Sequence, residues 1–168
     1  MKSILMSIKP YWVAKILNGE KTIEIRKKFP SNYRGWVYIY CTKNGYLHLE
    51  NNGKWSYSSN QKYTYVRTGK VVARFCCDEI EYIEAGDFKK FNYTSYGFDS
   101  FRNTISAFSC LSIEQIDAYL KGKDGYAIHI SKLEIFDKPI ELSAFDIKIS
   151  ENRYRRRKAP QSWQYIEI

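Results

Sequence analysis

Short runs of β-prone residues separated by turn residues dominate this chain, and only two stretches have the residue spacing of a helix. This pattern lacks the regular strand and helix alternation that builds a parallel α/β sheet. We therefore predict an α+β fold, in which a mixed, barrel-like sheet is flanked by helices. The expected strands are Ile4–Ile8, Thr22–Arg26, Trp36–Cys41, Lys70–Cys76, Tyr126–Phe136 and Trp163–Ile168.

Both predicted helices have residues that favour a defined start or end. Pro10 suits the first turn of the first helix, and Gly19 suits the left-handed position that ends it. Ser112 fits the N-cap of the second helix, which Gly122 follows. Residues 86–110 have no regular period, so we expect loops packed over the core there.

The length of 168 residues suits one domain spanning residues 1–168. Residues 44–68 are polar and turn-rich, which predicts one or two hairpins on an excursion. The chain has no signal-peptide pattern and no segment that approaches a membrane span. These features predict a soluble, cytoplasmic protein without membrane association.

The charge balance and the aromatic content favour a polyanionic partner. The chain has 27 Lys and Arg against 18 Asp and Glu, a net charge of +9, and 17% aromatic residues. Cations attract phosphates and aromatic faces stack on bases, so together they favour nucleic acid. A solvated positive surface and Tyr-rich strands are the structural alternative.

Metal-binding patterns are absent from the sequence. The four cysteines lack CxxC spacing, and His48 and His129 do not form a pair at metal-ligand spacing. We therefore expect reduced thiols and neither a metal site nor another cofactor.

The sharpest local signal is Gly19-Glu20-Lys21-Thr22-Ile23-Glu24-Ile25-Arg26. Alternation along a strand puts Glu24 and Arg26 on one face, while the preceding turn delivers Lys21 near them. Lys21 and Arg26 can hold a phosphate or a base edge, and Glu24 can orient Lys21, accept a base amino proton or act as a general base. The alternation also predicts a half-buried strand. The structural alternative to a binding site is an exposed, salt-bridged strand.

A second basic segment runs from Arg153 to Lys158 and includes Arg155 and Arg156. Guanidinium groups with interleaved aromatics neutralise phosphates and stack on bases. The following Gln161, Ser162 and Trp163 add hydrogen-bonding groups and a large stacking face, which favours a second wall of the same cleft. A solvated loop at the sheet edge is the alternative. His129 either faces this cleft or is an ordinary hydrogen-bonded histidine.

The run from Gly19 to Arg26 resembles the G-x-K-x-x-E-x-R signature of ASCH domains, and it follows a Ser-Ile-Lys-Pro segment, containing Lys9, that is typical of them. The resemblance covers most of the chain outside residues 44–68 and 86–109. It is similar to the form met in phages and related bacterial mobile elements. Further matching segments are Val37–Lys43, Gly69–Val72, Gly125–Ser131, Phe136–Pro139 and Ala159–Trp163.

The resemblance implies a PUA-like β-barrel with a cleft beside the first helix, where the motif faces RNA or a nucleotide. One branch of the superfamily hydrolyses acetylated cytidine, with a Lys at the position of Lys21, a Thr where this chain has Glu24, and a Glu from a later helix, where Glu114 stands. Because Glu24 replaces the proposed hydroxyl nucleophile, we expect a binding domain with no turnover and no metal requirement.

Two other functions remain open from the sequence. The first is a hydrolase, either an amidohydrolase acting on a modified nucleoside or a ribonuclease, with Lys21 and Glu24 as acid-base groups. The neighbouring cations favour the ionised form of Glu24, which suits it to orienting a ligand more than to taking protons. The second is a protein-binding accessory factor that uses residues 44–68 as its surface.

Overall fold

The computed structural model describes residues 2–60, 67–89, 96–145, 147–150, 153–155 and 158–167. The chain divides into two compact units, each assembled from segments far apart in the sequence. The first contains Met1–Asn18, Gly35–Cys76 and Lys132–Ile168, and the second contains Gly19–Arg34 and Cys77–Ser131. The expected single domain over residues 1–168 stays a prediction.

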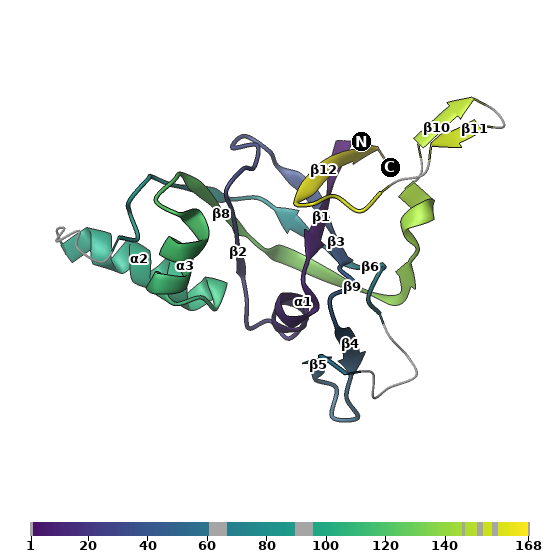
Figure 1. Cartoon of the computed structure of the whole chain (residues 1–168), viewed down its shortest axis with the longest axis horizontal. Helices are drawn as coiled ribbons and strands as arrows, with labels where there is room; N and C mark the ends of the chain where they lie inside the picture. Colours follow the sequence, from purple (N-terminus) through teal and green to yellow (C-terminus); the bar gives the residue numbers. More distant parts are fainter. Residues whose placement is uncertain are drawn as a thin grey trace. The chain divides into compact units, whose positions relative to one another are not determined.

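A mixed sheet forms the main layer of the first unit (Figure 1). Among the described residues its strand order is β12-β1-β3-β6-β9, and β1 runs antiparallel to β12 but parallel to β3. This order is open at β12 and β9, so barrel closure stays a prediction. The strands are β1 (Lys2–Ile8), β3 (Gly35–Cys41), β6 (Val71–Cys77), β9 (Ser131–Ile140) and β12 (Trp163–Glu167).

The core of the first unit is built from alternating strand residues. Leu5 of β1, Tyr38 of β3 and Val71 of β6 are buried together with Ile166 of β12. Phe145, from the short 3₁₀ helix η1 (Leu142–Phe145), packs its ring edge against Tyr38 at 5.7 Å between centroids. Side chains from strands distant in the sequence therefore form one hydrophobic cluster.

Helix α1 (Pro10–Leu17) has the predicted limits. Pro10 lies in its first turn, and Gly19 follows it with a φ of 73°, in the left-handed region that favours glycine. Asn18 connects α1 to a hairpin of β4 (Tyr46–Leu49) and β5 (Trp55–Ser58), because its side chain accepts from Trp55 N and donates to Trp55 O, both at 2.9 Å. The rest of the excursion includes residues 61–66, which lie outside the described residues.

The second unit has an antiparallel sheet of the order β2-β8-β7 in its described residues. Its strands are β2 (Ile23–Arg26), β7 (Ile80–Ile83) and β8 (Gly125–His129). Helices α2 (Tyr96–Ser109) and α3 (Ile113–Leu120) pack on the face that carries Ile23 and Ile25. The buried members of this core are Ile23, Ile25, Ile83, Phe88, Ile105, Ile116, Leu120 and Ala127.

Within the segment 86–110, helix α2 corrects the prediction of loops for residues 96–109, and residues 90–95 lie outside the described residues. Glycine, serine, asparagine and threonine give this segment a low helix propensity, which hid the helix. Ile105 is fully buried in the core of the second unit. Tertiary packing of one apolar face therefore stabilises a helix that local propensity does not favour.

The predicted strand Tyr126–Phe136 is two strands, β8 and β9. The chain leaves β8 after His129, and the φ of Lys132 is 46°. Strand β9 also extends beyond the predicted end at Phe136, through Pro139 to Ile140. In the described residues β9 lies at the edge of its sheet, where a proline that lacks an N–H donor removes no essential ladder bond.

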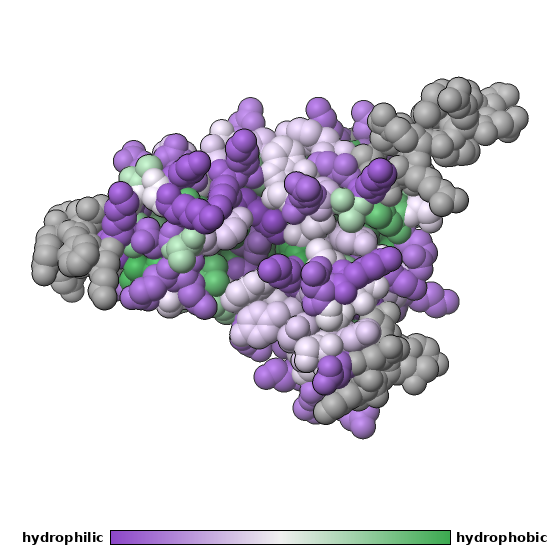
Figure 2. Space-filling model, viewed as in Figure 1, coloured by the Kyte–Doolittle hydropathy of each residue, from purple (hydrophilic) through white to green (hydrophobic). Residues whose placement is uncertain are grey.

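The remaining strands, β10 (Ile147–Ser150) and β11 (Arg153–Arg155), pair antiparallel as a separate ribbon. Figure 2 shows hydrophilic side chains over much of the face in view, with small hydrophobic patches between them. No helix among the described residues is long and apolar enough to cross a membrane.

The start of α3 has a reciprocal cap that can be tested. The Ser112 hydroxyl accepts from Gln115 N at 3.2 Å, and Gln115 Oε1 accepts from Ser112 N at 2.8 Å. Ser112→Ala should lower the free energy of unfolding by about 1 kcal/mol, measured by urea titration with circular dichroism. Ser59→Ala, in an exposed turn, is the control and should change it by less than about 0.5 kcal/mol. Equal effects of the two variants would contradict a stabilising cap.

Candidate functional site

Backbone hydrogen bonds fix the segment that carries Lys21, Glu24 and Arg26. Thr22 N donates to Phe108 O at the end of α2, and Thr22 O accepts from Ile130 N, both at 2.9 Å. Strand β2 then pairs with β8, so that Glu24 lies opposite Ile128 and Arg26 opposite Tyr126. The turn after Gly19 therefore leads directly into a strand whose register is set by β8.

The motif side chains form a three-membered ionic cluster, which we call the motif cluster. Glu24 Oε2 lies 3.3 Å from Lys21 Nζ, and Glu24 Oε1 lies 3.0 Å from Arg26 Nη2. Lys21 Nζ also donates to Ser109 O at 2.7 Å. One carboxylate thus serves two cations, and the end of α2 supplies a further acceptor.

The motif cluster is buried. The exposed fractions are 2% for Lys21, 7% for Glu24 and 8% for Arg26. The predicted half-buried strand is therefore wrong, since every residue of β2 is buried, and an exposed salt bridge does not describe these side chains.

Burial makes the motif cluster costly in free energy. Removing charges from water costs several kcal/mol per ion, which a buried pair regains only with good geometry and further hydrogen bonds. Apolar residues of similar volume often stabilise a fold as well as a buried ion pair does. Stability alone therefore does not account for three buried charges here.

Tyr119 of α3 is a member of the site that the sequence did not single out. Burial raises the pKa of its hydroxyl, while Arg26 lowers that pKa and Glu24 raises it by smaller amounts. Lys27 Nζ lies 5.1 Å from the centre of its ring. The effects of Arg26 and Glu24 on this pKa show that the hydroxyl lies near the motif cluster. In the sequence Tyr119 belongs to the amphipathic stripe of α3, and aromatic residues in such a stripe usually pack in the core, so it was not predicted as a site residue.

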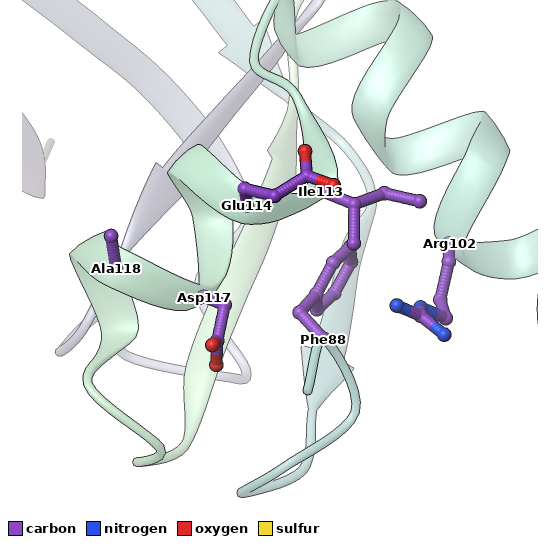
Figure 3. A pocket seen from close by; sticks show the side chains of 6 residues that line it. All are labelled: Phe88, Arg102, Ile113, Glu114, Asp117 and Ala118. Atoms are coloured by element: carbon purple, nitrogen blue, oxygen red, sulfur yellow. The ribbon is translucent and has the colours of Figure 1, made fainter. Parts of the chain in front are cut away.

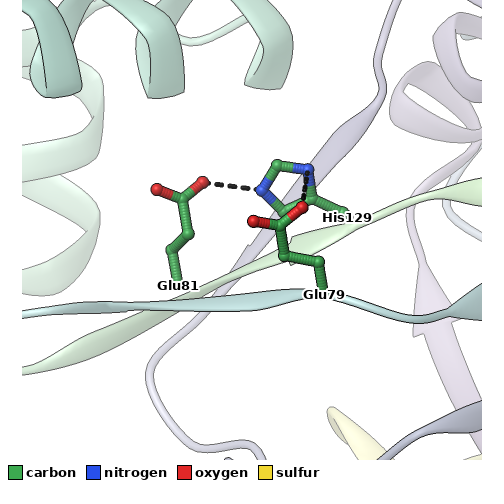
Figure 4. A group of neighbouring side chains, drawn as sticks. All are labelled: Glu79, Glu81 and His129. Carbon is green, nitrogen blue, oxygen red and sulfur yellow. Dashed lines mark hydrogen bonds and ion pairs between the residues drawn. The ribbon is translucent and has the colours of Figure 1, made fainter.

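His129 lies on the other face of the sheet from Glu24. In the register of β2 and β8 it pairs with Ile23, and directly paired residues share one face while neighbours along a strand alternate. Its ring contacts Glu79 and Glu81 (Figure 4). His129 is therefore not brought together with Glu24 and Arg26 on one face.

The first unit gathers other predicted residues at one end of its sheet. Ser7, near the end of β1, donates from N to Ser162 O at 2.9 Å and from Oγ to Pro160 O at 2.6 Å. Lys9 follows β1 as the N-cap of α1, and Trp163 begins β12 opposite Met6.

Gln161 is exposed, and Ser162 and Trp163 are half buried. Of the other predicted arginines, Arg155 has only its backbone described, in β11, and Arg156 lies outside the described residues. A single cleft shared by all these residues stays a prediction.

The second unit also has a pocket of about 340 Å³ between α2 and α3 (Figure 3). Its charged lining consists of Arg102 from α2 and of Glu114 and Asp117 from α3. Arg102 is 8% exposed, and its guanidinium lies 6.0 Å from the centre of the Phe88 ring. Glu114 therefore lies on the wall of a pocket lined by a mixture of charged and apolar groups.

Solved structures provide a comparison for the fold. A scan against protein-family models and a search of curated proteins gave no match. The chain is similar to the crystal structure of ASCH from Zymomonas mobilis, with a TM-score of 0.61 at 17% identity, over 98% of this chain and 87% of that one. Structures of two mutants of the same Zymomonas mobilis protein match at TM-scores of 0.58 and 0.60, with 17% and 15% identity. These matches cover 99% and 98% of this chain, and 91% and 88% of theirs.

The chain has the ASCH fold. The ASCH fold suggested by the G-x-K-x-x-E-x-R motif and the mixed α+β class are thus confirmed, whereas the PUA-like barrel stays a prediction. Within this ASCH fold the motif occupies the turn after α1 and strand β2. The resemblance to phage and mobile-element members stays a prediction.

The central position of Glu24 in the motif cluster gives a stability prediction. Glu24→Gln keeps the side-chain size but leaves two buried cations without their shared carboxylate, so it should lower the free energy of unfolding by about 3 kcal/mol or more. Glu134→Gln, which breaks an exposed ion pair with Arg74, is the control and should cost less than about 1 kcal/mol. Urea titrations of both variants measure the difference. A loss from Glu24→Gln no larger than the control's would contradict a buried, charge-compensating role.

Proposed function

We propose that the chain binds RNA or a modified nucleotide through Lys21, Glu24 and Arg26. The observation that carries this proposal is the burial of two cations around a single carboxylate. Such a cluster is expensive to keep for stability alone, whereas an anionic, hydrogen-bonding ligand can contact both its cations and its carboxylate.

Each member of the motif cluster has a distinct role in this proposal. The Arg26 guanidinium presents planar donors to a phosphate or a base edge, and Lys21 adds a second positive charge. Glu24 is held by both cations, so its oxygens are oriented to accept from a base amino group. Glu24 and Arg26 side chains each keep 10% of their area exposed, which leaves part of each group open to a ligand.

The first unit supplies cation and aromatic pairs that support nucleic-acid binding. The Trp163 and Tyr165 rings meet edge to face at 5.5 Å, and Lys2 Nζ lies 4.2 Å from the centre of the Tyr165 ring. Tyr11 of α1 lies 6.0 Å from Tyr57 of β5, and Lys15 Nζ lies 5.6 Å from the Tyr11 ring. Partly exposed aromatic faces next to ammonium groups are suited to stacking bases near phosphates.

Several finer features belong to the same proposal. The strands form a PUA-like barrel, and a basic, aromatic-lined surface with Lys9, Arg155, Arg156, Gln161, Ser162 and Trp163 also contacts the ligand. The protein acts in the cytoplasm, in a phage or mobile-element context. The +9 charge supports this proposal by favouring a polyanionic partner.

Salt dependence of RNA binding tests the proposal. Anisotropy of a fluorescein-labelled single-stranded RNA should show an affinity that falls at least about tenfold between roughly 50 and 200 mM salt, because bound cations release counterions from the phosphates. Lys21→Ala should abolish binding, whereas Lys70→Ala, which removes one charge from an exposed pair with Glu141, should change affinity only a few-fold.

A second variant keeps this test decisive if Lys21→Ala does not fold. Arg26→Lys retains the charge but loses the planar fork, so it should bind RNA several-fold more weakly. Undetectable binding at low salt, salt-independent affinity, or unchanged binding by a folded Lys21→Ala protein would each contradict the proposal.

We expect the protein to bind acetylated cytidine or RNA without turnover. Each oxygen of the Glu24 carboxylate pairs with a cation, so neither is placed to take a proton from water, and acetylated cytidine should remain uncleaved. Purified protein is incubated separately with acetylated cytidine and with RNA, and products are separated by chromatography. Multiple-turnover product that disappears with Glu24→Gln would replace the binding role with a hydrolase, either an amidohydrolase or a ribonuclease.

A further inference from the structure

Glu79, Glu81 and His129 form a second cluster of polar side chains in the second unit, which we call the His129 cluster. His129 Nε2 lies 2.6 Å from Glu81 Oε1, and Nδ1 lies 3.8 Å from Glu79 Oε2. Figure 4 shows both carboxylates turned toward the imidazole ring. One ligand atom from each residue can be chosen so that all three lie within 4.8 Å of one another.

We propose that the His129 cluster binds a divalent first-row transition-metal ion. One imidazole with two carboxylates is a donor set that suits Zn²⁺, Mn²⁺, Fe²⁺ or Co²⁺, whereas Mg²⁺ prefers oxygen ligands alone. The site is independent of the proposed RNA-binding role, because the register of β2 and β8 puts His129 and Glu24 on opposite faces of the sheet.

The backbone holds the three residues in place before any ion binds. Strands β7 and β8 pair antiparallel with Ile80 opposite Ile128, so Glu81 and His129 are diagonal neighbours. His129 N also donates to Glu79 O at 3.0 Å, which ties the residue before β7 to the end of β8. The ligands therefore come from hydrogen-bonded strands whose register cannot slip without moving the core.

The charge of the His129 cluster is otherwise uncompensated. Within the described part of the chain, neither carboxylate has an ion pair with a lysine or an arginine, and each has only His129 as its ionic partner. A divalent cation would neutralise both carboxylates at once, which a single imidazole does not do.

Ligation requires one carboxylate to move, because Glu81 lies at Nε2 and Glu79 at Nδ1, and one ion binds a single ring nitrogen. Metal–ligand distances of about 2.1 Å place neighbouring ligand atoms roughly 3.0–3.4 Å apart, so the three atoms must approach somewhat. The Glu79 side chain is 64% exposed and can rotate toward the ring. The side chains of Glu81 and His129 are 31% and 28% exposed, which leaves room for water to complete the coordination.

Titration calorimetry of the tag-free, metal-stripped full chain tests the site. We expect one Mn²⁺, Co²⁺ or Zn²⁺ per chain, with much weaker binding of Mg²⁺. His129→Asn and Glu81→Gln should each lower the metal affinity roughly 100-fold or more. Loss of a residue that only hydrogen-bonds to a metal ligand already lowers metal affinity about 10- to 100-fold, and loss of a ligand should cost at least as much. Glu84→Gln, which removes an exposed carboxylate just after β7, is the matched control and should bind like the unmodified chain.

The absorption spectrum of the Co²⁺ complex separates this site from the thiols. Nitrogen and oxygen ligands give only weak visible bands, whereas ligation by Cys76 or Cys110 adds an intense thiolate charge-transfer band. Weak bands that vanish in His129→Asn support the His129 cluster. Failure to bind all three transition metals, unchanged affinity in both cluster variants, or a thiolate band would overturn the proposal.

Discussion

The Glu24 carboxylate, buried between Lys21 and Arg26, is the constraint on which the candidate site depends. Because a buried charge without a partner destabilises a fold strongly, the three residues must be ordered together. Two hydrogen bonds connect this segment to the end of α2: Lys21 Nζ donates to Ser109 O, and Thr22 N donates to Phe108 O. The strand that carries the motif and the helix that packs on its sheet are therefore positioned by the same group of contacts.

The two-residue period of β-strands separates two kinds of chemistry on the small β2-β8-β7 sheet. One face carries Glu24 and Arg26. The other face carries the hydrophobic core and the His129 cluster. Each side chain belongs to one face or the other, so a ligand on one face need not affect the other. The proposed RNA-binding and metal-binding roles are compatible for this reason.

A buried cluster and an aromatic surface support nucleic-acid binding in different ways. Charges held by the fold cannot rearrange freely, which favours recognition of a defined group in a ligand. Surface pairs such as Lys2 with Tyr165 tolerate any base, because every base has a stacking face.

The sequence by itself determined the features that local chemistry controls. Pro10 and Gly19 delimit α1, and the Ser112 cap starts α3, because proline, glycine and N-cap preferences act within a few residues. The motif around Glu24 was also readable, since its members lie within one turn and one strand.

Only the tertiary structure decided the burial of the motif cluster, helix α2, and the approach of Glu79 and Glu81 to His129. Each depends on packing or strand pairing between segments far apart in the chain. Local sequence patterns contain no record of such long-range contacts.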